Sequence, residues 1–284
     1  MIIDHSLRLV FQHVPKCAGT ALRTAWQEAA EGRDLVSFFD FGFDPVLQRQ
    51  VDLAHQPLMD LRHRREWRFV RNYHVVACIR HPYQRLASAC REYYRQYSRE
   101  TEREMRRQPP SRNQLLHYLR HLPRAMDAHD LRYVHGFPIT WFSHYGTRPM
   151  VDTLLRCGHL NNDLEKLCTQ LELPQALRTQ LERVGAGERR RSSAALDQVE
   201  QDPDLRALAH VLHRDDFRCF GFERTTTCFQ DPELKELIEQ SQAVGPSHCL
   251  PLTNLTPQMR WYYGRSSERP EPVLRATRAP RSRQ

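Results

Sequence analysis

A short segment near the N-terminus has the composition of an anion-binding loop. Lys16 supplies a positive charge and Thr20 a hydroxyl, and the small residues Ala18 and Gly19 lie between them. Small residues let a backbone approach a phosphate closely. The segment runs into a predicted helix, whose first N–H groups have no partner within the helix and lie at the positive end of its dipole. The sequence therefore predicts a phosphate-binding loop at this point.

A second candidate anion site follows a second apolar segment. Residues 75–79 form a compact apolar run, which is typical of a central parallel strand. Arg80 comes directly after it, Pro82 suits the first position of a helix, and Ser88 lies two turns further on. Arginine offers a fixed charge and a bidentate fork, and serine adds a hydroxyl. Both side chains are expected at the carboxyl edge of a sheet, where open α/β folds bind ligands.

Each candidate anion site lies between a predicted strand and a predicted helix. Residues 7–11 are apolar and β-prone, and residues 20–30 place apolar side chains on one helical face. Another strand is predicted at residues 35–39, and residues 152–168 are predicted to form a strand, a turn and a helix. This alternation predicts an α/β fold with a central, mainly parallel sheet flanked by helices.

Three further expectations concern the segments between these elements. Residues 40–68 show no clear period and are predicted to be irregular. The helix within residues 152–168 is expected to be capped near Asn161 or Asn162. Residues 185–193 are rich in Gly, Arg and Ser, and this composition predicts a flexible, basic loop.

Both candidate anion sites resemble motifs of one protein family. Residues 13–20 resemble the 5′-phosphosulfate loop of sulfotransferases that use 3′-phosphoadenosine 5′-phosphosulfate (PAPS). The likeness is greatest to the carbohydrate-type branch, which includes heparan sulfate 2-O-sulfotransferase and many bacterial relatives. Residues 80–88 resemble the 3′-phosphate motif of the same family, although His81 replaces the more common Asp. The resemblance extends, discontinuously, from Leu7 to Phe222 and implies the P-loop-like nucleotide-binding fold of a bacterial sulfotransferase.

The resemblance also implies which residues hold PAPS. The 3′-phosphate is assigned to Arg80 and Ser88, and Arg85 is expected to be structural. Lys16 is expected to stabilise charge on the leaving phosphate oxygen, so that no metal is required. The residues expected around the 5′-phosphosulfate are Pro15, Lys16, Cys17, Ala18, Gly19, Thr20 and Ala21.

A histidine is the expected catalytic base. His55 lies in a segment similar to the one that carries the base in the family, ahead of the second nucleotide-binding strand. An acceptor hydroxyl must lose its proton as it attacks sulfur, and histidine ordinarily titrates near neutral pH. Glu28 and Glu66 are the alternatives, because other sulfotransferase branches use Glu. In relatives, a loop at the position of residues 189–193 closes over the nucleotide.

Composition limits the remaining possibilities. The chain has 284 residues and a net charge of +8, which favours anionic partners. Only three of its 42 basic residues are lysines, so the lysine at position 16 is conspicuous. The sequence contains no apolar run of 18 residues and no signal-peptide pattern, which predicts a cytoplasmic protein without a membrane span. The eight cysteines form no C-x-x-C pair, so neither a zinc site nor a disulfide scaffold is expected.

The predicted organisation has three parts. Residues 1–223 are expected to form the sulfotransferase domain, residues 224–263 a helical extension packed on it, and residues 264–284 a disordered basic tail. The expected partners are PAPS, its product 3′-phosphoadenosine 5′-phosphate (PAP), and an acceptor hydroxyl, with a sugar as the family default. The oligomeric state stays open.

Two other classes of function compete with this prediction. A P-loop-like kinase is disfavoured because the Gly-Lys-Ser/Thr sequence and a Mg²⁺-binding Asp are missing. A nucleotide- or polyanion-binding protein with a degenerate sulfotransferase fold would explain the charge. Against nucleic acid as a partner, the arginines are dispersed and no known binding motif is present.

Overall fold

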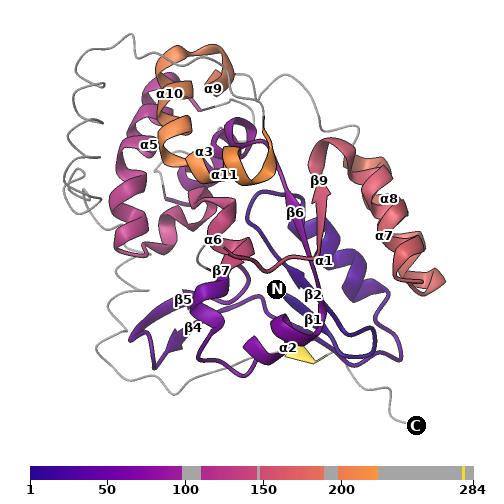
Figure 1. Cartoon of the computed structure of the whole chain (residues 1–284). Coiled ribbons are helices and arrows are strands. Elements are labelled where there is room, and N and C mark those ends of the chain that lie inside the picture. The colour runs from indigo at the N-terminus through magenta and orange to yellow at the C-terminus, as the bar shows by residue number, and fades with distance from the viewer. Residues whose placement is uncertain (98–109, 146–147, 189–197, 223–276, 279–284) are drawn as a thin grey trace. The chain divides into compact units, whose positions relative to one another are not determined.

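The fold is built on a six-stranded sheet (Figure 1). The computed structural model describes residues 1–97, 110–145, 148–188, 198–222 and 277–278. The chain divides into two compact units, the first comprising Met1–Arg80, Trp141–Ser192 and Ser266–Gln284, the second His81–Thr140 and Ser193–Arg265. The predicted extension at residues 224–263 lies outside the described residues. Of the predicted tail, only β10 (Thr277–Arg278) is described, so both of these predictions stay open.

The first unit contains the whole sheet, in the order β10-β3-β1-β2-β6-β9. Its other strands are β1 (Ile2–Asp4), β2 (Leu9–Gln12), β3 (Leu35–Ser37), β6 (His74–Ile79) and β9 (Thr153–Arg156). Strands β2, β6 and β9 are parallel, with β9 at one edge of the sheet, and this arrangement confirms the predicted α/β class. The antiparallel strand β1 was not predicted. Only residues 5–8 connect it to β2, and so short a connection permits only an antiparallel pair.

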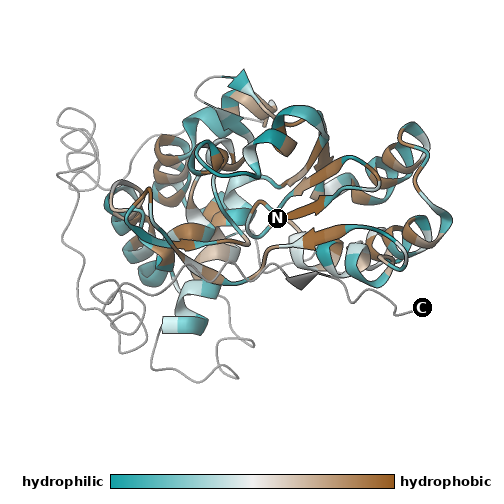
Figure 2. Cartoon of the chain, turned by 90° about the horizontal axis from the view of Figure 1, so that it is seen from below, coloured by the Kyte–Doolittle hydropathy of each residue, from teal (hydrophilic) through white to brown (hydrophobic). Residues whose placement is uncertain are grey.

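The two faces of the sheet pack against different elements. On one face Phe11 of β2 stacks on Trp26 of α1 (Gly19–Glu28), with ring centroids 5.5 Å apart. On the other face Ile3, Val10 and Val75 form a buried cluster with apolar residues of the segment between β3 and β6. Figure 2 shows the strands as predominantly hydrophobic ribbons and the helices as mixed ones, as expected for a sheet covered on both faces.

The segment covering the second face is ordered, so the prediction of an irregular stretch at residues 40–68 was wrong. It forms a hairpin of β4 (Phe41–Asp44) and β5 (Arg49–Asp52), followed by η1 (Leu58–Leu61) and α2 (Trp67–Asn72). The Asp44 carboxylate accepts hydrogen bonds from the N–H groups of Val46 and Leu47 and so closes the hairpin turn. A turn set by one side chain leaves little trace in the hydrophobic pattern.

Two helices that follow β9 in the chain also belong to the first unit. In Figure 1, α7 (Leu160–Gln170) and α8 (Gln175–Glu188) lie side by side, and α8 also contacts α1. The predicted cap at Asn161 or Asn162 was wrong, because the N-cap residue is His159 and forms no side-chain capping bond. The flexible loop predicted from residue 185 was also wrong at its start, because α8 continues to Glu188. Residues 189–193 lie outside the described residues.

The described residues of the second unit are mainly helical. The helices described there are α3 (Pro82–Tyr97), α5 (Arg112–Asp127), η2 (Leu131–Gly136), α9 (Gln198–Gln201), α10 (Pro203–Leu212) and α11 (Arg214–Phe220), and α6 (Ile139–Ser143) begins at the boundary of the unit. Fully buried Arg85 of α3 donates hydrogen bonds to the carbonyl oxygens of His135 and Phe137. Arg85 is therefore structural, as predicted.

Candidate functional site

The loop between β2 and α1 has an unusual backbone. Lys16 and Ala18 both have left-handed conformations, with φ of 63° and 57°, and Cys17 between them is buried. Ala18 is the N-cap residue of α1 and forms no side-chain capping bond. A left-handed residue that follows a right-handed one is the backbone pattern of a nest, in which successive N–H groups bind an anion, and the left-handed conformation of Ala18 suits such a nest. The helix start and the charge of Lys16 favour the same kind of ligand.

Gly19 is required by a close contact with a histidine. A Cβ atom at this position would lie 1.9 Å from Cδ2 of the His13 ring. The ring is buried, with 4% of its residue surface exposed, and so has little room to move. Packing therefore restricts Gly19, the first residue of α1, to glycine.

Replacing Gly19 with Ala is expected to destabilise the protein by about 1–3 kcal/mol, the usual range for overpacking a filled site. The substitution should also weaken anion binding, because relief of the clash must displace either the His13 ring or the start of α1. Gly187→Ala is the matched control, because a Cβ atom at that position would meet nothing within 4 Å and alanine favours a helix. Urea denaturation of both variants measures the difference, and equal stabilities would contradict the packing argument.

Arg80 lies at the same edge of the sheet as this loop. Strands β2 and β6 are parallel, and Gln12 is in register with Ala77. The residues that follow the two strands therefore leave the sheet at its carboxyl edge, the loop from β2 and Arg80 from β6. The structure thus brings Lys16 and Arg80 to one edge, as the sequence predicted.

His55 lies beside the segment that connects β2 to α1. Its imidazole contacts the ring of His13, with centroids 4.4 Å apart, and His13 in turn packs against Gly19. Nδ1 of His55 lies 2.7 Å from a carboxylate oxygen of Asp52, the last residue of β5. A hairpin that was not predicted therefore supports the predicted base.

The alternative bases are placed less favourably. Glu28 is the last residue of α1, roughly 13 Å from Gly19 at the helical rise of 1.5 Å per residue. The Glu66 carboxylate forms an ion pair with Arg64, at 3.4 Å. His55, in contrast, contacts the segment 13–20 directly, through the ring of His13.

The remaining predicted residues belong to the second unit or to its edge. Ser88 lies on α3 and is partly buried. Its part in phosphate binding stays a prediction. His81, where the family more often has Asp, accepts a hydrogen bond on Nδ1 from the N–H of Tyr83 at 3.4 Å. At the start of α3 an imidazole thus accepts a long hydrogen bond, at the position where the family more often has a carboxylate.

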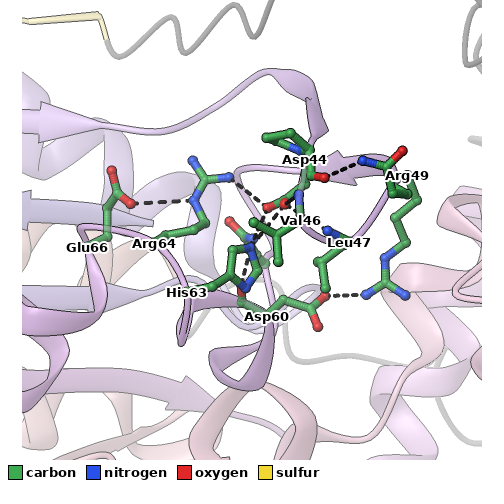
Figure 3. Close-up of polar contacts among 11 residues, drawn as sticks. Asp44, Val46, Leu47, Arg49, Asp60, His63, Arg64 and Glu66 are labelled. Carbon is green, nitrogen blue, oxygen red and sulfur yellow. Dashed lines mark hydrogen bonds and ion pairs between the residues drawn. The ribbon is translucent and has the colours of Figure 1, made fainter. Parts of the chain in front are cut away.

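A second Asp–His pair lies in the same unit as His55 (Figure 3). Nε2 of His63 lies 2.9 Å from buried Asp44, and Arg64 forms an ion pair with the same carboxylate at 3.4 Å. Burial raises the pKa of Asp44, but hydrogen bonds from His63, Leu47 and Val46 outweigh it, and the net pKa lies below the usual 3.8. Figure 3 shows this carboxylate enclosed by its donors, an arrangement that stabilises the hairpin.

Sequence reasoning missed three residues that position the predicted ones. Asp52 contacts His55, His13 packs between His55 and Gly19, and Gln12 Nε2 donates to the carbonyl oxygen of Gln56 at 2.8 Å. Asp52 precedes His55 by three residues, a spacing that could have suggested a local contact. No local signal marks the contact of Gln12 with Gln56.

The fold and the site together define an α/β protein in which the loop after β2 and Arg80 after β6 lie at the carboxyl edge of two adjacent parallel strands. The model of the Sulfotransferase family matches residues 1–223, and the chain belongs to this family. The family match supports sulfuryl transfer as its general chemistry. Neither the curated proteins nor the solved structures include a significant match to the chain.

The described residues also bear on the predictions about a membrane span and a metal. None of the helices described has both the length and the apolar composition needed to cross a membrane. Within the same residues, no group of three or more His, Cys, Asp or Glu side chains is arranged to hold a metal ion.

Proposed function

We propose that the protein transfers a sulfuryl group from PAPS to an acceptor hydroxyl. The observation that carries this proposal is the placement of Lys16 and Arg80 after adjacent parallel strands, at one edge of the sheet. PAPS has two anionic groups, the 5′-phosphosulfate and the 3′-phosphate, and a donor of this kind needs two cationic sites. Membership of the sulfotransferase family supports sulfuryl transfer as the reaction.

The loop residues suit the 5′-phosphosulfate. Lys16 and Ala18 have left-handed backbone conformations, and they lead into the start of α1, where the N–H groups of the first helical turn favour an anion. As sulfur is transferred, negative charge grows on the phosphate oxygen that leaves. Lys16 would stabilise that charge, so the loop favours the transition state over the bound donor.

The other roles follow from the chemistry of the side chains. Arg80 would bind the 3′-phosphate through charge-assisted hydrogen bonds, and Ser88 would add a hydroxyl donor. His55 would accept the proton of the attacking hydroxyl. A carbohydrate is the acceptor we propose, and a cytoplasmic location remains part of the proposal.

Calorimetric titration with PAP tests the nucleotide site. We expect wild type to bind PAP, and Arg80→Ala to bind it about 10- to 100-fold more weakly, because a hydrogen bond to a charged group contributes about 1.5–3 kcal/mol. Lys16→Ala should also weaken binding. 5′-AMP, which lacks the 3′-phosphate, should bind wild type about as poorly as PAP binds Arg80→Ala.

Arg8→Ala is the matched control, because exposed Arg8 precedes β2 at the opposite end of the strand from the loop. It removes the same charge and should leave PAP affinity unchanged. Failure of a folded wild type to bind PAP would contradict the proposal. Salt-sensitive binding to DNA in its place would favour the polyanion-binding alternative.

A further inference from the structure

The contact between Asp52 and His55 has the geometry of an orienting pair. Nδ1 of His55 lies 2.7 Å from Oδ2 of Asp52, whose side chain is 7% exposed. An ionised carboxylate only accepts hydrogen bonds, so Nδ1 must carry the hydrogen. In a neutral imidazole the lone pair then lies on Nε2, the nitrogen able to take a proton.

The Asp52 carboxylate is itself fixed in place. Its Oδ1 accepts a hydrogen bond from the Ala54 N–H at 3.0 Å, and its main-chain oxygen accepts one from the His55 N–H at 3.1 Å. Gln12, the last residue of β2, donates to the carbonyl oxygen of Gln56 at 2.8 Å. The segment that carries His55 is therefore held at both ends, by β5 and by β2.

We infer that Asp52 is a positioning residue, which holds His55 as the Nδ1–H tautomer and so leaves the lone pair that takes the acceptor proton on Nε2. This inference rests on the proposed function. In the reaction the acceptor oxygen forms a bond to sulfur, and the bond from sulfur to the bridging phosphate oxygen breaks. The electron pair of the broken bond stays on PAP, and the hydroxyl proton passes to Nε2 of His55. Asp52 neither gains nor loses a proton, and its charge stabilises the imidazolium that forms.

Asp52→Asn isolates this role from the role of Asp52 in the turn. An asparagine oxygen can still accept the hydrogen bond from the Ala54 N–H. The amide NH₂ then faces Nδ1 of His55 as a donor, which favours the opposite tautomer, with hydrogen on Nε2. The substitution conserves shape and should leave PAP affinity unchanged, because Lys16 and Arg80 are intact.

Nuclear magnetic resonance of the full chain with ¹⁵N-labelled histidine tests the inference directly. The His55 signals are identified by their loss in His55→Gln. We expect the Nδ1–H tautomer in wild type and a shift toward Nε2–H in Asp52→Asn. Asp44→Asn is the matched control, since it alters the other Asp–His pair, with His63, and should leave the His55 signals unchanged. An unchanged His55 tautomer in Asp52→Asn would overturn the inference.

The rate of PAP release from PAPS provides the second readout. We expect Asp52→Asn to lower kcat by about tenfold to 10⁴-fold, the upper value being that known for the orienting aspartate of Ser-His-Asp triads. KM for PAPS should not change, and Asp52→Glu, which keeps the carboxylate, should recover part of the rate. A tautomer shift without loss of kcat would also overturn the inference.

Failure of the proposed function gives a different result. Absence of PAP binding by folded wild type removes the sulfotransferase proposal and with it the catalytic meaning of the pair. The tautomer measurement needs no PAPS and would still decide whether Asp52 orients His55.

Discussion

Replacing His55 with alanine is expected to slow sulfuryl transfer by about 10²- to 10⁴-fold, the range that a positioned general base contributes. The affinity for PAP should remain that of wild type, because the phosphates are assigned to Lys16, Arg80 and the start of α1. A loss of kcat without a loss of donor affinity is therefore the expected signature. Release of PAP from PAPS, with a panel of sugar hydroxyl acceptors, measures the rate, and calorimetry measures the affinity.

His63→Ala is the control for this experiment. His63 is also paired with an aspartate in the same unit, but its carboxylate partner serves the hairpin turn. The variant should lose stability and keep its rate at temperatures where it remains folded. Wild-type turnover by His55→Ala would show that His55 is not the base, and Glu66→Gln would then be the variant to compare.

The position of the loop between β2 and α1 was predictable because its parts are adjacent in the chain. Lys16, Ala18 and Gly19 lie between an apolar strand and a helix, so the local sequence determines both their chemistry and their position. Arg80 was predictable for a related reason. Parallel strands place their carboxyl ends at one edge, and the residue after β6 must share that edge with the residue after β2.

The surroundings of His55 were not predictable in this way. Its position depends on a hairpin whose turn is closed by Asp44 and on the link between Gln12 and Gln56, 44 residues apart. Neither contact produces a periodic pattern. Gly185 misled the prediction for the opposite reason, because glycine suggests a loop, but in α8 its Cβ position faces Asn161 and packing favours the small residue.

The second unit contains a buried charged group, and its removal is expected to have a large effect on stability. Asp216 is fully buried and accepts hydrogen bonds from the N–H groups of Ile139 and Thr140, at 2.8 and 2.9 Å, and from Nδ1 of His213 at 2.9 Å. Asp216→Ala leaves these donors buried without their acceptor. We expect a loss of about 3–5 kcal/mol in the free energy of unfolding. Exposed Asp215→Ala, the adjacent control, should change it by less than about 0.5 kcal/mol.

The buried pair of His213 and Asp216 predicts how the free energy of unfolding responds to acid. Burial lowers the pKa of His213 below its usual 6.5. Burial raises the pKa of Asp216, but hydrogen bonds and charge from His213, with Arg85 and the Ile139 N–H, bring it below its usual 3.8. Each group binds fewer protons in the folded protein than in the unfolded chain. The free energy of unfolding must therefore fall as the pH decreases below the usual pKa of each group.

Urea denaturation at pH values from neutral to 3, monitored by far-ultraviolet circular dichroism, measures this dependence of stability on pH. We expect a first decline in wild type below about pH 6.5, from His213, and a steeper one below about pH 3.8, from Asp216. Asp216→Asn cannot lose a carboxylate charge, so its stability should fall less steeply below pH 3.8, while the decline that His213 causes should persist. Identical slopes in the two proteins below pH 3.8 would mean that other carboxylates, such as Asp44 and Asp163, govern acid unfolding, because their pKa values are also lowered by the hydrogen bonds they accept.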